Sequence, residues 1–286
     1  MTIRLLDLSG RIDWLVAVFD DITEIADSLG IPFFVIGATV RDLILEHQYK
    51  IRPRRGTEDL DLGIEIEDWG KFRALSEALL SSGKFSNGKS AHTFLYDGKL
   101  PIDIVPFGKI ENEEKEIIWP TEHETAMSVI GFADAYENSL TVRLRAKPIL
   151  EVKVASIPGL VILKLISWKD RGAGDNRDAV DLAFIIENYH QAGNDERLYD
   201  EHSDIMEELD YNITDAGARL LGRDVAAIVK PETRKMLSRI LEEEINDDGQ
   251  CRLITKMCEP PFSDEQFDKY TTLLNEFYKG FTEAPE

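Results

Sequence analysis

The pattern of hydrophobic and polar positions divides the chain into a mixed first half and a helical second half. Apolar residues recur at helical spacing over residues 11–29, and Gly30 is expected to end that helix. The short apolar run PFFVIG (32–37) predicts a buried strand, and residues 39–47 predict a short helix that leaves it. Residues 59–66 (DLDLGIEI) alternate strictly between polar and apolar side chains, which predicts a strand with one buried face.

The remaining elements follow the same two periods. Residues 68–83 have the spacing of an amphipathic helix, with Asp68 as its expected N-cap. The other predicted elements are a pair of strands around a turn at Asp97-Gly98, strands at 140–145 and 149–155, and helices at 159–171 and 176–193. We therefore predict an α/β (α+β) fold. A small mixed β-sheet domain with flanking helices occupies residues 1–155, and an all-helical region occupies residues 156–286.

The bulk composition describes a globular chain without a targeting segment. The chain has 286 residues, 43% of them hydrophobic, which is ample for a buried core. No stretch reaches the roughly 18 uninterrupted apolar residues of a membrane span, and residues 1–20 lack the apolar stretch and cleavage site of a signal peptide. Cys251 and Cys258 fit no zinc spacing and are interpreted as ordinary thiols. We expect a cytoplasmic protein with no membrane partner.

The charge of the chain argues against one broad class of function. The formal net charge is −21 at pH 7, whereas tight, sequence-independent nucleic-acid binding depends on Lys and Arg that neutralise phosphates. The densest basic segment is the loop at 47–56, with Lys50, Arg52, Arg54 and Arg55. This loop has two interpretations, a solvated connection or a contact for phosphate groups.

Three aspartates carry the strongest chemical signal. Asp59 and Asp61 are two residues apart on one predicted strand and therefore share a face. Asp103 lies between two isoleucines on a later predicted strand. Clustered carboxylates raise one another's pKa unless a cation lies among them, and Mg²⁺ (or Mn²⁺) prefers oxygen ligands. We expect these three aspartates to bind a divalent metal and to act in catalysis.

A glycine turn precedes the aspartates. Gly37 ends a predicted strand and opens a predicted helix, so the backbone N–H groups of Gly37, Ala38 and Thr39 could bind phosphate oxygens. The Thr39 hydroxyl could add a further donor. Arg41 is a candidate for the same nucleotide site, although an ion pair with Asp42 is an alternative role for it. Together, metal and donors would bind a triphosphate.

Gly37-Ala38, Asp59-x-Asp61 and Asp103 resemble the signature of the nucleotidyltransferase superfamily that includes DNA polymerase beta. Over roughly residues 30–185 the chain most resembles the AbiEii-type nucleotidyltransferases, some of which are toxins of toxin–antitoxin systems. The resemblance implies a metal-dependent transfer of a nucleotide from an NTP to a hydroxyl acceptor. That acceptor could be an RNA 3′ end such as tRNA, a protein or a small molecule, and a cognate antitoxin is an implied partner.

The resemblance extends to a second block in the helical half. It contains Lys164 on one predicted helix and the run Arg177-Asp178-x-x-Asp181 on the next. Lys164 could contact a phosphate as a point charge. The resemblance implies nucleotide binding by Lys164 and Arg177, and it implies that Asp178 assists the acceptor or holds the lysine and arginine. Asp181 shares a helix face with Asp178. The helical region is expected to complete the active-site cleft.

The chain departs from the superfamily pattern at Ala38 and in its longer gap between Gly37 and Asp59, and a second resemblance leaves a further alternative open. The superfamily usually has Gly or Ser where this chain has Ala38, which is compatible with a catalytically degenerate relative that binds nucleotide or a partner protein. GATVRDLIL (37–45) also resembles CCA-adding enzymes and poly(A) polymerases, but no RRDFTIN-like segment follows the aspartates. Phe107 and Trp168 are interpreted as core residues, although both rings could stack on a base, and His92 is interpreted as a structural or surface residue.

Overall fold

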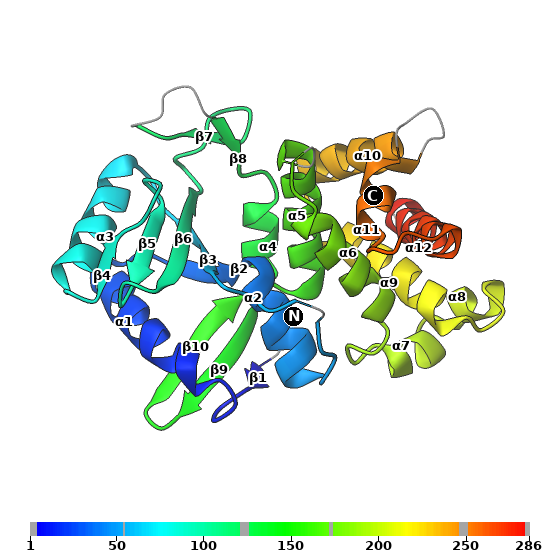
Figure 1. Ribbon diagram of the computed structural model, residues 1–286, viewed down its shortest axis with the longest axis horizontal. Coiled ribbons are helices and arrows are strands. Elements are labelled where there is room, and N and C mark those ends of the chain that lie inside the picture. Colours follow the sequence, from blue (N-terminus) through cyan, green and yellow to red (C-terminus); the bar gives the residue numbers. More distant parts are fainter. Residues whose placement is uncertain (1–4, 54, 121–125, 172–173, 246–250, 284–286) are drawn as a thin grey trace. The chain divides into compact units, whose positions relative to one another are not determined.

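The computed structural model describes residues 5–53, 55–120, 126–171, 174–245 and 251–283 (Figure 1). The chain forms two compact units, each with its own core. The first comprises Met1–Leu43 and Arg54–Ser156, and the second comprises Ile44–Pro53 and Ile157–Glu286. The first unit is built around a β-sheet and the second is helical, which confirms the predicted mixed α/β fold with a helical C-terminal region.

The first unit contains a mixed eight-stranded sheet in the order β1-β9-β10-β2-β3-β6-β5-β4. Its strands are β1 Leu5–Asp7, β2 Phe33–Ile36, β3 Leu60–Glu65, β4 Phe85–Asn87, β5 Thr93–Tyr96, β6 Leu100–Phe107, β9 Leu140–Ala146 and β10 Ile149–Val154. The helices of this unit include α1 Asp13–Leu29, α2 Gly37–Arg41, α3 Trp69–Ser81 and α4 Phe132–Glu137. A separate two-stranded sheet pairs β7 Glu116–Ile118 with β8 Ala126–Ser128.

The predicted local signals correspond to observed structure. Gly30 ends α1 in the left-handed conformation, and the Asp68 carboxylate accepts hydrogen bonds from the first backbone N–H groups of α3. Asp97 and Gly98 both have positive φ angles, of 48° and 66°, as a tight hairpin turn requires. The predicted hairpin over 92–108 is therefore confirmed.

The sheet is buried on both faces at its centre. Leu60, Leu62 and Ile64 of β3 are almost fully buried, as their alternation predicted. On the opposite face, Phe34 and Phe107 form a cluster of ring contacts with two aromatic residues of α4. Because both faces are covered there, polar side chains of β3 are confined to its ends.

The segment after β2 differs from the expected regular helix over 39–47. The helix α2 ends at Arg41, and a π-helical segment, η1, continues from Asp42 to Gln48. Residues Ile44–Pro53 belong to the second unit, so the chain changes unit within η1. The strands β1, β4, β7 and β8 were not predicted either, because each has three residues and too short a run to show a period.

The second unit is built of helices. They are α5 Ile157–Arg171, α6 Arg177–Asn188, α7 Asp195–Asp200, α8 Ser203–Glu208, α9 Ile213–Ile228, α10 Pro231–Ile245, α11 Arg252–Met257 and α12 Asp264–Glu283. The backbones of α9 and α12 meet at two glycines. A Cβ on Gly222 would lie 2.0 Å from the Phe277 carbonyl oxygen, and one on Gly280 would lie 2.0 Å from the Arg219 carbonyl oxygen. Both positions therefore exclude any side chain.

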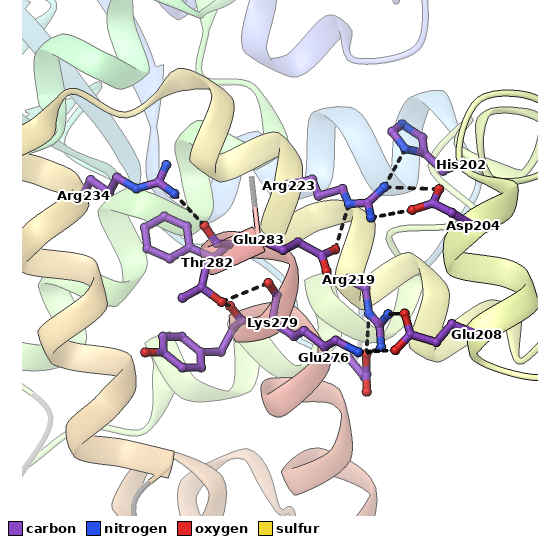
Figure 2. Close-up of polar contacts among 12 residues, drawn as sticks. His202, Asp204, Glu208, Arg219, Arg223, Arg234, Glu276, Lys279, Thr282 and Glu283 are labelled. Atoms are coloured by element: carbon purple, nitrogen blue, oxygen red, sulfur yellow. Dashed lines mark hydrogen bonds and ion pairs between the residues drawn. The ribbon is translucent and has the colours of Figure 1, made fainter. Parts of the chain in front are cut away.

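Arginines of α9 join this helix to its neighbours through ion pairs (Figure 2). Arg219 is buried, and it donates to Glu208 over 2.8 Å and to Glu276 over 2.6 Å. Hydrogen bonds from Lys279 and Arg219 lower the pKa of the Glu208 carboxyl. Arg223 contacts Asp204 and Glu283 in the same way. Each of the two arginines thus pairs with one carboxylate of α8 and one of α12.

Among the described residues, no helix combines the length and the apolar character that crossing a bilayer requires.

Candidate active site

The glycine turn is held against one of the predicted aspartates. Gly37 follows β2, opens α2 and has a φ of 70°. A Cβ at this position would lie 1.9 Å from Asp61 Oδ2, so the Asp61 carboxylate occupies the space that a side chain would need. Any residue other than glycine would displace Asp61 and would also be strained by the positive φ. The structure thus brings Gly37 and Asp61 together.

Asp61 and Asp103 lie side by side. They are register partners on the adjacent parallel strands β3 and β6, so their side chains project from the same face of the sheet. Both residues are partly buried. A hydrogen bond of 2.6 Å from Thr93 Oγ1 to Asp103 Oδ1 orients the second carboxylate. The two acids are thus neighbours across adjacent strands, and their joint binding of a metal stays a prediction.

Asp59 lies one residue before β3, and its backbone carbonyl accepts a hydrogen bond of 3.1 Å from Thr39 Oγ1. The buried Thr39 hydroxyl thus donates to the backbone and connects α2 to the start of β3. In the described parts of the chain, no three His, Cys, Asp or Glu side chains are grouped so that they could hold a metal ion. A role of the Asp59 carboxylate as a third ligand stays a prediction.

Two carboxylates nevertheless fit the coordination preference of Mg²⁺. Mg²⁺ is usually bound by one or two carboxylates together with substrate phosphates and water, and not by a complete protein cage. Asp61 and Asp103 supply such a pair at the end of the turn that holds Gly37 and Ala38. The two carboxylates are therefore compatible with a divalent ion that binds together with a nucleoside triphosphate.

Arg41 is buried and forms the ion pair with Asp42 that was one of its two predicted roles, with Nη2 2.6 Å from Oδ1. The same guanidinium donates to the Arg55 carbonyl oxygen over 2.9 Å and so anchors the end of the basic loop. Within that loop, the Arg52 side chain is 87% exposed, and Lys50 Nζ donates to the His47 carbonyl oxygen over 2.9 Å. Arg54 lies outside the described residues.

A second charged cluster is formed within the helical unit. Lys164 of α5 is buried, and its Nζ lies 2.6 Å from Asp181 Oδ2 and 3.1 Å from Asp178 Oδ1. Arg171 reaches the other oxygen of Asp178 at 3.3 Å. Asp178 thus holds the lysine, as the resemblance implied. Arg177 pairs instead with Asp175, at 2.6 Å.

Asp181 is the residue of this cluster that sequence reasoning left without a role. Its side chain is fully buried, and it makes the shorter of the two contacts with Lys164. The spacing of three residues from Asp178 on one helix was the available signal, because such residues share a face. Burial of the pair could not be read from that spacing.

Phe107 and Trp168 lie in the core, as interpreted from the sequence. Trp168 is buried, and its indole N–H donates to Glu244 over 3.0 Å. Phe107 belongs to the buried aromatic cluster, and the His92 ring packs on Trp119 with centroids 5.1 Å apart. The two cysteines are free thiols.

Comparison with known proteins identifies the chain as a nucleotidyltransferase. The model of the family described as nucleotidyl transferase AbiEii toxin, type IV TA system, matches residues 25–270. The chain therefore belongs to the AbiEii nucleotidyltransferase family. No curated protein matches the chain in sequence.

Solved structures similar to the chain are distant from it. The antibiotic-resistance factor ANT(2'')-Ia has 12% sequence identity and a TM-score of 0.37, covering 70% of this chain and 98% of its own. A CCA-adding enzyme in complex with ATP has 16% identity and a TM-score of 0.32, covering 90% of this chain. The Thermotoga maritima CCA-adding enzyme complexed with tRNA has 18% identity and a TM-score of 0.30. The chain spans 66% and 67% of these two CCA-adding enzymes.

Proposed function

We propose that the protein transfers a nucleoside monophosphate from an NTP to a hydroxyl acceptor with the help of Mg²⁺ or Mn²⁺. The acceptor is an RNA 3′ end such as that of tRNA, a protein or a small molecule. The observation that carries the proposal is the register pairing of Asp61 with Asp103 beside the Gly37 turn. Membership of the AbiEii family supports the transfer reaction itself.

The roles of individual residues follow from their contacts. Asp61 and Asp103 would hold the metal, which when bound offsets phosphate charge and acidifies an attacking hydroxyl. The backbone N–H groups of Gly37, Ala38 and Thr39, which open α2, are the proposed donors to phosphate oxygens. Asp59 and Arg41 belong to the proposed site as a ligand and as an anchor of the loop at 55–57.

For the helical unit we propose nucleotide-binding roles for Lys164 and Arg177 and a catalytic role for Asp178. Two carboxylates fix the position of the positively charged Lys164 ammonium group. A group that binds phosphate oxygens must be positioned in this way. Asp178 forms ion pairs both with the buried Lys164 and with the exposed Arg171. Arg177, which is more than half exposed, is the proposed second cation for the nucleotide.

The transfer is tested with purified protein, each of the four NTPs labelled at the α-phosphate, and cell extract as the source of acceptor. We expect label to become covalently attached to an extract component in Mg²⁺ or Mn²⁺, and no label when EDTA removes the metal. NTP labelled at the γ-phosphate serves as the matched control, because nucleotidyl transfer releases that phosphate with pyrophosphate. Equal labelling with and without metal would contradict the proposal, and so would label from the γ-phosphate alone.

We further propose that the protein has a cognate antitoxin, because its family is described as a type IV toxin–antitoxin component. Induced expression is expected to arrest growth, and co-expression of the product of a neighbouring gene is expected to restore it. Colony counts measure both effects, with an Asp61→Asn, Asp103→Asn double variant as the inactive control. Arrest that the double variant causes equally would argue against toxicity through this site.

A further inference from the structure

We propose that Thr93 is a positioning residue for the candidate metal ligand Asp103, and that its hydroxyl sets the affinity of the site for the divalent ion. The proposal rests on the function proposed above. It adds a residue outside the Gly37, Asp59-x-Asp61 and Asp103 pattern. Thr93 is not expected to touch the nucleotide or the metal, and it acts through the Asp103 carboxylate.

The first support is the contact itself. Thr93 of β5 is the antiparallel register partner of Asp103 of β6, so the two side chains lie next to each other on one face of the sheet. Thr93 Oγ1 donates to Asp103 Oδ1 over 2.6 Å, a short bond of the kind that a hydroxyl makes to a charged carboxylate. Asp61 is the partner of Asp103 on its other side. The order across the sheet is therefore Asp61, Asp103, Thr93.

The second support is a tight turn that delivers Thr93 to this place. The Gly88 N–H donates to the Thr93 carbonyl over 2.8 Å, and the Thr93 N–H donates to the Ser90 carbonyl over 3.1 Å. A Cβ on Gly88 would lie 2.5 Å from Thr93 Cγ2 and 2.8 Å from the Thr93 backbone oxygen. Gly88 therefore leaves space for the threonine methyl group, and the rotamer that directs the hydroxyl to Asp103 fits without a clash.

The third support is a cluster of aromatic rings that packs against His92, the residue before Thr93. The His92 ring packs on Trp119, and Trp119 contacts Trp69 and Phe72 with centroids 5.1 and 5.3 Å apart. The His92 carbonyl also accepts the Ile104 N–H over 2.9 Å. Because Trp119 is almost fully buried, its contact with His92 restrains the backbone at residues 92 and 93.

The expected consequence is a carboxylate with one preferred orientation. A hydrogen bond to Oδ1 restricts rotation of the Asp103 side chain and leaves the remaining lone pairs for a cation. Partners that orient a metal ligand in this way typically contribute 10- to 100-fold in metal affinity or activity. Half-buried Asp103 has one such partner in Thr93, so the loss of the hydroxyl should weaken metal binding near the lower end of that range.

The test is a titration of the full-length protein with Mn²⁺ in the presence of a saturating non-hydrolysable NTP. Electron paramagnetic resonance measures the binding of Mn²⁺. Thr93→Val removes the hydroxyl with little change in shape, and Thr93→Ala is a second variant that lacks it. Both are expected to raise the Mn²⁺ Kd by about 10-fold. Thr93→Ser keeps the hydroxyl and is expected to restore the wild-type value. Thr141→Val, on the distant strand β9 of the same sheet, is the matched control and should leave the Kd unchanged.

The outcomes separate this proposal from the proposed function. A wild-type protein that binds Mn²⁺, together with an unchanged Kd in Thr93→Val and Thr93→Ala, would overturn the role of Thr93 and leave metal-dependent transfer standing. A wild-type protein that binds no Mn²⁺ with saturating NTP would overturn both. If Thr93→Ser is as weak as Thr93→Val, the effect comes from strand packing and the positioning role is wrong.

Discussion

Replacement of Asp61 by Asn is expected to reduce nucleotide transfer by about a thousandfold, or ~4 kcal/mol of transition-state stabilisation. Asn has nearly the shape of Asp, so it fits against Gly37 without moving the turn. It lacks the negative charge that, with Asp103, would hold a divalent ion. The measurement is the initial rate of label transfer from α-labelled NTP at saturating Mg²⁺.

Glu65→Gln is the matched control for this variant. Glu65 lies on the same strand and the same face of the sheet as Asp61, four residues away, and it is exposed. The substitution makes the same change of charge without touching the turn, so the rate should stay near that of the wild type. A rate above about a tenth of wild type in Asp61→Asn would contradict the assignment of this carboxylate to the metal.

Replacement of Asp181 by Ala is expected to destabilise the helical unit by about 3 kcal/mol, the lower end of the range for a broken buried ion pair. The variant removes the closer of two carboxylates from Lys164, which is itself buried. Asp178 remains in contact with the lysine and offsets part of the cost. The measurement is the free energy of unfolding from urea denaturation monitored by circular dichroism.

Two further variants check the physical cause. Asp178→Asn should cost less than Asp181→Ala, because the Asp178 side chain is 16% exposed and water can replace part of its contact. Lys164→Met combined with Asp181→Leu should regain most of the lost stability, since a buried ion pair can be replaced by apolar residues of similar volume. Failure of the double variant to regain stability would show that the ion pair is not the origin of the effect.

Much of the fold follows from short-range patterns along the chain. The alternation in residues 59–66 predicted β3, and the Asp97-Gly98 pair predicted the hairpin turn between β5 and β6. Asp68 and Gly30 marked the start of one helix and the end of another. Each of these signals depends on a few neighbouring residues, so it can be read without the rest of the molecule. The three-residue strands and the π-helix η1 could not be read in this way, because they depend on distant pairing partners and on packing.

The candidate active site was predicted in composition and not in arrangement. The chain alone shows that Gly37, Asp61 and Asp103 have the residue types of a phosphate and metal site. It cannot show that Asp61 fills the space beside Gly37, that Asp103 has Thr93 as its hydrogen-bond donor, or that Asp181 is the buried partner of Lys164. These contacts connect residues that are separated along the chain. Strand register and helix packing bring such residues together, and bury them, only when the whole domain folds.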